Sequence, residues 1–303
     1  MSVEFCGLSL AHPIINGSGT FDAIAAKAVF GDALTRSFPF AAYVSKTITL
    51  QPRQGNAAPR LWESPSGLIN SIGLPNKGLR GYLEEDLPQL AQIASAARTG
   101  PSGSPEREGI PIFTNVMGST AADIAELLAA CQERAEIAAL ELNVSCPNVS
   151  TGLDIGADPA VLASVLAQVR PHTSKPLIVK LTPNTADVAL CARAAQDAGA
   201  DAVSLINTLR AMALSPGRAR ASAEAWLGAR TGGLSGPAIR PVALAQVAAV
   251  AAAVSIPVIG MGGVQRAAHA RDLLDAGATL VAVGTESFRD PSAAGRIAAA
   301  LRE

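Results

Sequence analysis

Short runs of apolar residues recur along the whole chain, and each run ends in a polar or glycine-rich stretch. Near-continuous apolar runs of this length are typical of strands that are buried on both faces, as in parallel sheets. Segments rich in alanine and leucine, with apolar positions at helical spacing, lie between most of these runs. The pattern predicts strands at residues 13–19, 41–47, 111–118, 139–147, 176–183, 201–208, 256–263 and 280–285.

Two of the predicted helices carry end signals in the sequence. Ser119 or Thr120 and Thr185 stand where an N-cap is expected, with Asp123 and Asp187 in or near the first turns. The phrase DAGA ends the second of these helices and returns before the last strand, where its glycine can adopt a left-handed C-cap conformation. These signals support the alternation of helices with strands.

Eight strand–helix alternations in 303 residues predict an α/β fold, a (β/α)8 TIM barrel that forms one domain over residues 1–303. An open doubly wound sheet is the alternative, which the absence of a GxGxxG motif after the first strand weakens.

Two long connections, 48–84 and 209–236, leave the carboxyl ends of strands. Because that end is the active face of a barrel, both are expected to be functional loops. The segment 98–109 precedes a strand, and we expect a surface loop at the opposite face.

Composition excludes several classes of protein. The net charge is −1 and there is no basic run, which disfavours nucleic-acid binding. The sequence contains no uninterrupted apolar run of about 18 residues, so a membrane span is not expected. The first residues lack the basic and apolar regions of a signal peptide, so a cytoplasmic location is expected.

Cysteine and histidine spacing predicts neither a disulfide framework nor a metal site. The four cysteines are widely separated, and the three histidines are scattered; we expect the histidines to be surface or loop residues and all the cysteines but one to be structural. These residues are Cys6, Cys131, Cys146 and Cys191, and His12, His172 and His269. The exception is Cys146, which follows a strand beside Pro147 and could be structural, a redox thiol or a catalyst.

Two lysines are placed at the carboxyl ends of predicted strands. Strand alternation puts Lys180 on the same face as Ile178 and Thr182, and Lys46 ends the second strand in a similar way. Burying a lysine is costly unless an anion lies beside it. Two such cations at the mouth of a barrel predict an anionic cofactor, an anionic substrate, or both.

Glycines and asparagines complete the predicted site. The seventh and eighth strands end in GMGG and GTES, and glycines at these two strand ends favour a phosphate group, because backbone N–H groups can approach its oxygens. Asparagines at 70, 115, 143, 148 and 207 offer paired donors and acceptors, which suits a planar ligand with amides and a carboxylate.

Nine blocks of sequence, in order along the whole chain, resemble the flavin-dependent dihydroorotate dehydrogenases of class 1, which use a cysteine base. The blocks are NGSGTF, SKTITLQPRQGNAAPR, NSIGLPNKG, LNVSCPN, IVKLTPN, INTLRAM, GGLSGPAIRP, IGMGG and VGTESF. The segments INTLRAM and TGGLSGPAI look most like subclass 1B, whose catalytic chain pairs with an iron–sulfur flavoprotein subunit. Three features depart from the family pattern: the four arginines in loop 209–236, Pro75 with Lys77, and NGSGT in place of the commoner NASGT. They bear on the identity of the electron acceptor and not on that of the substrate.

The resemblance implies FMN in the barrel mouth and dihydroorotate beside it. The residues that it implies for FMN are Ser18, Lys46, Thr47, Asn115, Asn143, Lys180, Ile206, Gly236, Gly262, Gly263, Gly284 and Thr285. For the substrate they are Lys46, Asn70, Ser71, Ile72, Gly73, Leu74, Asn143, Asn148, Asn207 and Thr208. Cys146 would be the base, and the positive charge of Lys46 would supply an electrostatic field that favours its thiolate. Lys180 would stabilise negative charge on the reduced flavin.

The resemblance further implies oxidation of dihydroorotate to orotate in pyrimidine biosynthesis, with a proton leaving C5 for Cys146 and a hydride leaving C6 for the flavin. The chain has no ferredoxin-like cysteine cluster and no dinucleotide motif, so transfer of electrons to NAD would need a partner subunit that carries FAD and a 2Fe-2S cluster. The alternatives are a fumarate-reducing enzyme of subclass 1A type, a related FMN oxidoreductase acting on another dihydropyrimidine, and a non-catalytic flavin-binding barrel. A homodimer core is the family expectation.

Overall fold

The centre of the molecule is one eight-stranded sheet, in which every pair of hydrogen-bonded neighbours is parallel. The structure is a computed structural model, and it describes residues 2–99, 107–145, 155–215 and 224–302. The strands are β3 (Ile14–Asn16), β4 (Tyr43–Val44), β9 (Ile112–Val116), β10 (Ile137–Asn143), β11 (Leu177–Lys180), β12 (Ala202–Leu205), β15 (Val258–Met261) and β16 (Leu280–Val283). They follow the order β3-β16-β15-β12-β11-β10-β9-β4, so all eight predicted strands are confirmed.

A side chain completes the ring between the two end strands. The Asn16 amide Nδ2 donates to Val44 O at 2.8 Å, and its Oδ1 accepts from Val44 N at 2.8 Å. The amide of Ala41 donates to Ile14 O at 2.9 Å just below. An asparagine offers one donor and one acceptor in the same spacing as a backbone peptide, so it can replace a rung of the ladder. The sheet therefore closes into the predicted (β/α)8 barrel.

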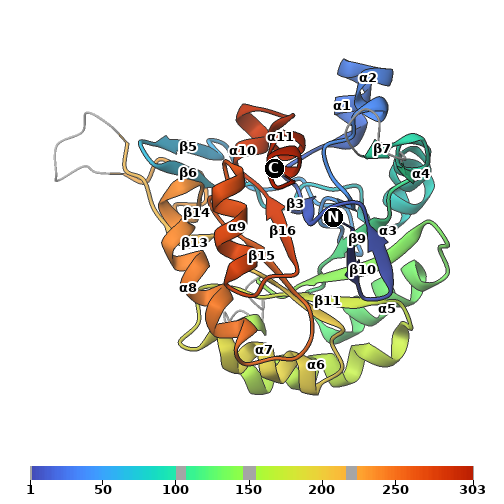
Figure 1. Ribbon diagram of the computed structural model, residues 1–303. Coiled ribbons are helices and arrows are strands. Elements are labelled where there is room, and N and C mark those ends of the chain that lie inside the picture. The colour runs from blue at the N-terminus through green and yellow to red at the C-terminus, as the bar shows by residue number, and fades with distance from the viewer. Residues whose placement is uncertain (1, 100–106, 146–154, 216–223, 303) are drawn as a thin grey trace.

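Helices surround the barrel. In Figure 1, α5 to α9 follow one another around the outside of the strands, and each packs on the next. The helices are α1 (Ala23–Phe30), α2 (Asp32–Arg36), α3 (Gly78–Gly81), α4 (Leu87–Ala96), α5 (Ala121–Gln132), α6 (Pro159–Val169), α7 (Val188–Asp197), α8 (Arg240–Ala251), α9 (Ala267–Asp275), α10 (Glu286–Arg289) and α11 (Ala293–Ala300). A π-helical turn joins α3 to α4, and short 3-10 turns precede α6 and α8 and follow α6; these turns are Tyr82–Asp86, Ile155–Ala157, Pro237–Ile239 and Arg170–His172.

The capping predictions are partly confirmed. Thr120 caps α5 through a reciprocal pair of hydrogen bonds with Asp123. At α7 the cap is Asp187, whose Oδ1 accepts from Leu190 N at 3.0 Å, and not Thr185. The Thr185 hydroxyl donates instead to Ala157 O at 2.8 Å, so it binds the 3-10 turn Ile155–Ala157 and does not cap the helix.

The two long connections build a second sheet that the sequence did not predict. Its strands are β5 (Leu61–Ser64) and β6 (Gly67–Asn70) from the first connection, and β13 (Leu209–Ala211) and β14 (Gly232–Ser235) from the second. They are antiparallel in the order β13-β14-β6-β5, and Figure 1 shows β5, β6, β13 and β14 gathered on one side of the barrel. Two loops more than 120 residues apart in sequence therefore act as one structural unit beside the barrel mouth.

Two smaller ribbons complete the sheet structure. Strands β1 (Val3–Phe5) and β2 (Leu8–Leu10) form a hairpin, and β7 (Arg98–Thr99) pairs with β8 (Arg107–Glu108). The predicted surface loop at 98–109 thus begins and ends in a short antiparallel pair, and its centre lies outside the described residues.

The apolar core of the barrel has two parts, separated by the eight-stranded sheet, and a third small cluster lies at the second sheet. Leu177, Val179 and Leu181 belong to the part between sheet and helices, whereas Ile178 belongs to the part inside the barrel. This confirms the predicted alternation along β11 and places Lys180 on the inner face with Ile178. Among the described helices, none is long and apolar enough to cross a membrane.

One of the three histidines contradicts the expected surface or loop position, because His269 is buried within helix α9, whereas His12 lies in the loop between β2 and β3. His12 is 4% exposed, and its Nδ1 accepts from Ile14 N at 3.2 Å. His269 on α9 is also buried, whereas His172 is exposed. The described residues contain no group of histidine, cysteine and acidic side chains that could hold a metal ion.

Candidate active site

A deep cavity of about 590 Å³ opens at the carboxyl ends of the barrel strands. Ligand sites of enzymes fall in this range of volume, and barrel enzymes place them at this face. Its walls come from the ends of β10, β11, β15 and β16, from the chain after β3, β4 and β12, and from the second sheet. The two predicted functional connections therefore do reach the cavity.

Most of the predicted site residues lie together in this cavity. Those that line it are Ser18, Lys46, Thr47, Asn70, Ile72, Leu74, Asn143, Lys180, Ile206, Asn207, Thr208, Gly236, Gly262, Gly263, Gly284 and Thr285. Segments from nearly the whole chain contribute, as expected for loops that follow successive strands of a barrel. The predicted residues Cys146 and Asn148 lie outside the described residues.

Three predicted residues do not line the cavity. Ser71 is buried behind it, where its hydroxyl is 2.8 Å from Asn56 Nδ2, and Gly73 packs closely against the backbone of Asn56. Residues 70, 72 and 74 line the cavity while the two residues between them do not, and the chain turns at Gly73 and Leu74, where φ is +75° and +54°. Asn115 is fully buried below the cavity.

Two lysines converge on the cavity, as predicted. Lys180 at the end of β11 is only 6% exposed, whereas Lys46 is exposed to the mouth. Within the part of the chain that the structure describes, neither ammonium group has a hydrogen bond or an ion pair. A buried cation without a partner is costly, and a bound anion removes the cost. The electrostatics of the cavity therefore suit an anionic ligand.

Strand β10 supplies the polar floor of the cavity. Asn143 lines the cavity, and its Oδ1 accepts from Ser145 N at 3.1 Å, which leaves the carboxamide Nδ2 for a ligand. Two residues earlier on the same face, Glu141 is buried and bonded to Asn115 and Ser204. The sequence signal for Glu141 was its shared face with Asn143; its partners come from other strands.

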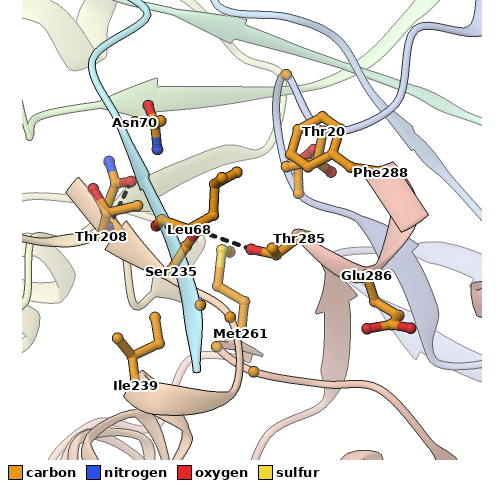
Figure 2. Close-up of a pocket in the computed structure, with 18 of the residues that line it drawn as sticks. Thr20, Leu68, Asn70, Thr208, Ser235, Ile239, Met261, Thr285, Glu286 and Phe288 are labelled. Atoms are coloured by element: carbon orange, nitrogen blue, oxygen red, sulfur yellow. Dashed lines mark hydrogen bonds between the residues drawn. The ribbon is translucent and has the colours of Figure 1, made fainter. Parts of the chain in front are cut away.

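The glycine-rich wall is formed by backbone in conformations that favour glycine. Gly262 has φ +137° and Gly263 has φ +68°. A Cβ on Gly263 would stand 2.9 Å from Gly236 O, closer than such contacts normally are. Nearby, Thr285 Oγ1 is 2.9 Å from Ser235 Oγ, and Figure 2 shows these two side chains pointing toward each other. Close backbone and two hydroxyl groups are a suitable surface for phosphate oxygens.

Several lining residues were not predicted. Gln265 Nε2 donates to Glu286 Oε2 at 2.9 Å at the glycine-rich end. Leu61 and Phe288 are more than half exposed at the rim, where Arg289 also pairs with Glu63 at 3.2 Å. They sit on short elements at the mouth, β5 and α10, which carry no apolar periodicity long enough to reveal them.

The described cysteines have the properties of structural thiols. Burial raises the pKa of Cys131 to about 12. Burial, with the nearby Asp201 carboxylate, raises the pKa of Cys6 to about 11. Burial also raises the pKa of Cys191. A raised pKa keeps each of them as an unreactive thiol near neutral pH, which agrees with their predicted structural role.

These features define a (β/α)8-barrel protein with a deep cavity at its active face, lined by two lysines and a glycine-rich wall. Comparison with known proteins identifies the family. The family model described as dihydroorotate dehydrogenase matches residues 1–303, and the chain belongs to this family.

Curated relatives agree over the full length of the chain. The chain is 42% identical over 304 residues to the dihydroorotate dehydrogenase B (NAD(+)), catalytic subunit, of Citrifermentans bemidjiense, covering 100% of this chain and 92% of the relative. It is 43% identical over 299 residues to the subunit of the same name from Pelobacter propionicus, covering 98% of this chain and 91% of the relative. It is 42% identical over 306 residues to the subunit of the same name from Desulforudis audaxviator, covering 100% of this chain and 91% of the relative. The family predicted from the motifs is confirmed, and the relatives' names agree with subclass 1B.

Proposed function

We propose that this chain is an FMN-dependent dihydroorotate dehydrogenase that oxidises dihydroorotate to orotate in pyrimidine biosynthesis. The observation that carries the proposal is the cavity at the barrel mouth, with Lys180 buried and without an anionic partner among the described residues. Family membership narrows the reaction to this substrate. Residues 1–303 would act as one FMN-binding barrel domain.

The residues of the cavity fit FMN. Gly236, Gly262 and Gly263 offer close backbone for the phosphate, and Lys180 offers a cation to the ring system. FMN, when bound, supplies the acceptor for a hydride from the substrate. A cation held in a water-poor site stabilises negative charge that develops nearby, without having to reorganise during the reaction. Lys180 would have this role.

The substrate would lie above the flavin site, between the second sheet and the end of β10. Lys46 at the mouth would bind the carboxylate of dihydroorotate, and Asn70, Asn143 and Asn207 would bind its amide groups. Their predicted partners in this task, Ser71 and Gly73, face away from the cavity and would act only by shaping the segment 70–74.

Cys146 would accept the C5 proton of dihydroorotate. In the sequence it follows Ser145, three residues after Asn143, which lines the cavity at the end of β10. The other three thiols are kept protonated by their surroundings, as their raised pKa values show. Proton removal by a positioned side chain typically accelerates a reaction by about 100- to 10,000-fold.

Anaerobic reduction of the bound flavin tests this proposal. The purified protein should be yellow and should bleach with dihydroorotate much faster than with dihydrouracil, which lacks the carboxylate. Cys146→Ala should slow bleaching by about 100-fold or more. Cys6→Ser is the matched control, because a hydroxyl can keep the hydrogen bond to Asp201 O and the residue lies away from the cavity. A protein that cannot be reconstituted with FMN, or equal bleaching by both substrates, would contradict the proposal.

The electron acceptor is a second part of the proposal. The relatives' names include NAD(+) and the word subunit, so we propose that electrons pass to NAD through a partner subunit that carries FAD and a 2Fe-2S cluster. NAD reduction should appear only when the partner is added. Rapid fumarate reduction by the chain alone would instead support the 1A-type alternative. The cytoplasmic location and the homodimer core stay predictions.

A further inference from the structure

A buried acidic residue lies just below the cavity without contacting it. Glu141 on β10 is 2% exposed, and its carboxylate accepts two hydrogen bonds inside the barrel. Asn115 Nδ2 of β9 donates to Oε2 at 2.5 Å, and the Ser204 hydroxyl of β12 donates to Oε1 at 2.7 Å. The carboxylate therefore ties three strands together at one level of the barrel.

The chemistry of this contact fixes the orientation of the Asn115 carboxamide. A carboxylate can only accept hydrogen bonds, so it selects the NH₂ end of the amide and excludes the carbonyl end. The Asn115 Oδ1 atom must then face away from Glu141. This oxygen is fully buried and has no hydrogen-bond partner within the described chain.

An unpartnered buried acceptor is rare in native proteins and calls for a donor that binds later. The inward-facing residue two positions after Glu141 on β10 is Asn143, which lines the cavity. On β11, Lys180 pairs with both Asn143 and Ser204 in the ladders and lines the cavity as well. The Asn115 amide thus lies one level beneath the cavity floor.

We propose that Glu141 is a positioning residue: it orients the Asn115 carboxamide so that Oδ1 points away from Glu141 and can accept a hydrogen bond from an N–H group of the cofactor bound above it. The inference rests on FMN binding in the proposed function. Glu141 itself touches neither the cofactor nor the substrate. Its effect on binding passes through Asn115, and this dependence separates it from a general structural role.

A double-mutant cycle on FMN affinity tests the dependence. Apoprotein is titrated with FMN, and the dissociation constant is read from quenching of flavin fluorescence. Glu141→Leu should weaken FMN binding by about tenfold, roughly the loss of one buried hydrogen bond. In an Asn115→Ala background the same substitution should have no further effect, because the amide that it orients is absent. Equal weakening in both backgrounds would overturn the proposal.

Two isosteric variants guard against failure of Glu141→Leu to fold. Asn115→Asp places two carboxylates face to face and should weaken FMN binding strongly. Adding Glu141→Gln restores a donor to this pair and leaves an acceptor oxygen toward the cavity, so the double variant should recover most of the affinity. No recovery would overturn the proposal. The visible absorption bands of bound FMN should shift in the single variant and return in the double variant.

Thr114→Val is the matched control. Thr114 is the fully buried neighbour of Asn115 on β9, but its hydroxyl lies 2.7 Å from the Tyr82 hydroxyl, on the helix side of the strand. Its loss should lower stability and leave FMN affinity within about twofold. Wild-type protein that does not bind FMN would count against the proposed function itself, whereas normal binding with an additive cycle would count only against the role of Glu141.

Discussion

The inside of the barrel has two levels with opposite chemistry, although the same strands build both. Toward the amino ends, Phe113, Ala139 and Ile178 belong to a closed apolar cluster. Two residues further along the same strands stand Asn115, Glu141 and Lys180. Because side chains alternate with period two, each strand places one apolar and then one polar residue on the inner face.

This comparison separates the residues that stabilise the barrel from those that bind its ligand. The lower level excludes water and lowers the free energy of the folded state through burial of apolar area. Among the described residues, the upper level carries a lysine and an amide oxygen without partners, which cost stability until a ligand arrives. Active sites are often less stable than their scaffold for this reason. Substitutions at the two levels should therefore have opposite effects on stability and activity.

Phe113→Ala should have the largest effect on stability. Phe113 is fully buried and stacks on Phe5 with ring centroids 5.9 Å apart. Truncating such a ring removes apolar contacts and leaves a cavity, so we expect the free energy of unfolding to fall by about 3–5 kcal/mol. Urea denaturation of the apoprotein measures the change. Phe30→Ala is the control, because that ring is 47% exposed on α1 and its loss should cost much less. Equal costs would contradict the distinction between the closed lower level and the surface.

Lys180→Met, in the upper level, should have the opposite effect: activity should fall while stability is kept. Removing a buried ammonium that has no partner in the described part of the chain should leave the apoprotein at least as stable as the wild type. Loss of the cation should slow anaerobic flavin reduction by dihydroorotate by about 100- to 1,000-fold, the range for one group that stabilises developing charge. Stopped-flow absorbance measures the rate, and urea denaturation the stability.

The control for this experiment lies at the other end of the same strand. Lys175 Nζ donates to Ile137 O at 2.8 Å, two residues before β11 begins. Lys175→Met should cost about 1 kcal/mol of stability through the lost hydrogen bond and leave flavin reduction unchanged. If Lys180→Met reduced its flavin at the wild-type rate, or if both variants were equally slow, the proposed role of Lys180 would be wrong.

Local sequence was sufficient to find the barrel and much of its upper level. Strands that are buried on both faces leave near-continuous apolar runs, so all eight were visible before any contact was known. Alternation along one strand was enough to put Lys180 inside with Ile178. Residues at the carboxyl ends of strands must meet at one face of a barrel, which is why most predicted residues share the cavity.

What the sequence could not reveal depends on pairing between distant segments. The second sheet joins β6 to β14, which are more than 160 residues apart. Ser71 and Gly73 face away from the cavity because Asn56, in another part of the loop, packs behind them. Asn115 does not line the cavity, and its Nδ2 donates to Glu141 of the neighbouring strand. None of these contacts leaves a periodic signal in the chain.

His12 allows a smaller test of the lower level, through pH. It lies just before β3, at the amino end of the barrel, and burial, with the nearby Arg302, lowers its pKa to about 4 from an ordinary 6.5. Between these two values the unfolded chain binds a proton that the folded protein does not, so stability falls as pH drops from about 6.5 toward 4. The loss attributable to His12 amounts to as much as about 3 kcal/mol, from about 1.4 kcal/mol for each unit of pKa.

His12→Asn, which can still accept from Ile14 N–H, should flatten this part of the curve of unfolding free energy against pH. His172→Asn is the control, because that side chain is exposed and its replacement should leave the curve as in the wild type. If both variants kept the wild-type slope, burial of a neutral histidine beneath the barrel could not be the source of its sensitivity to acid.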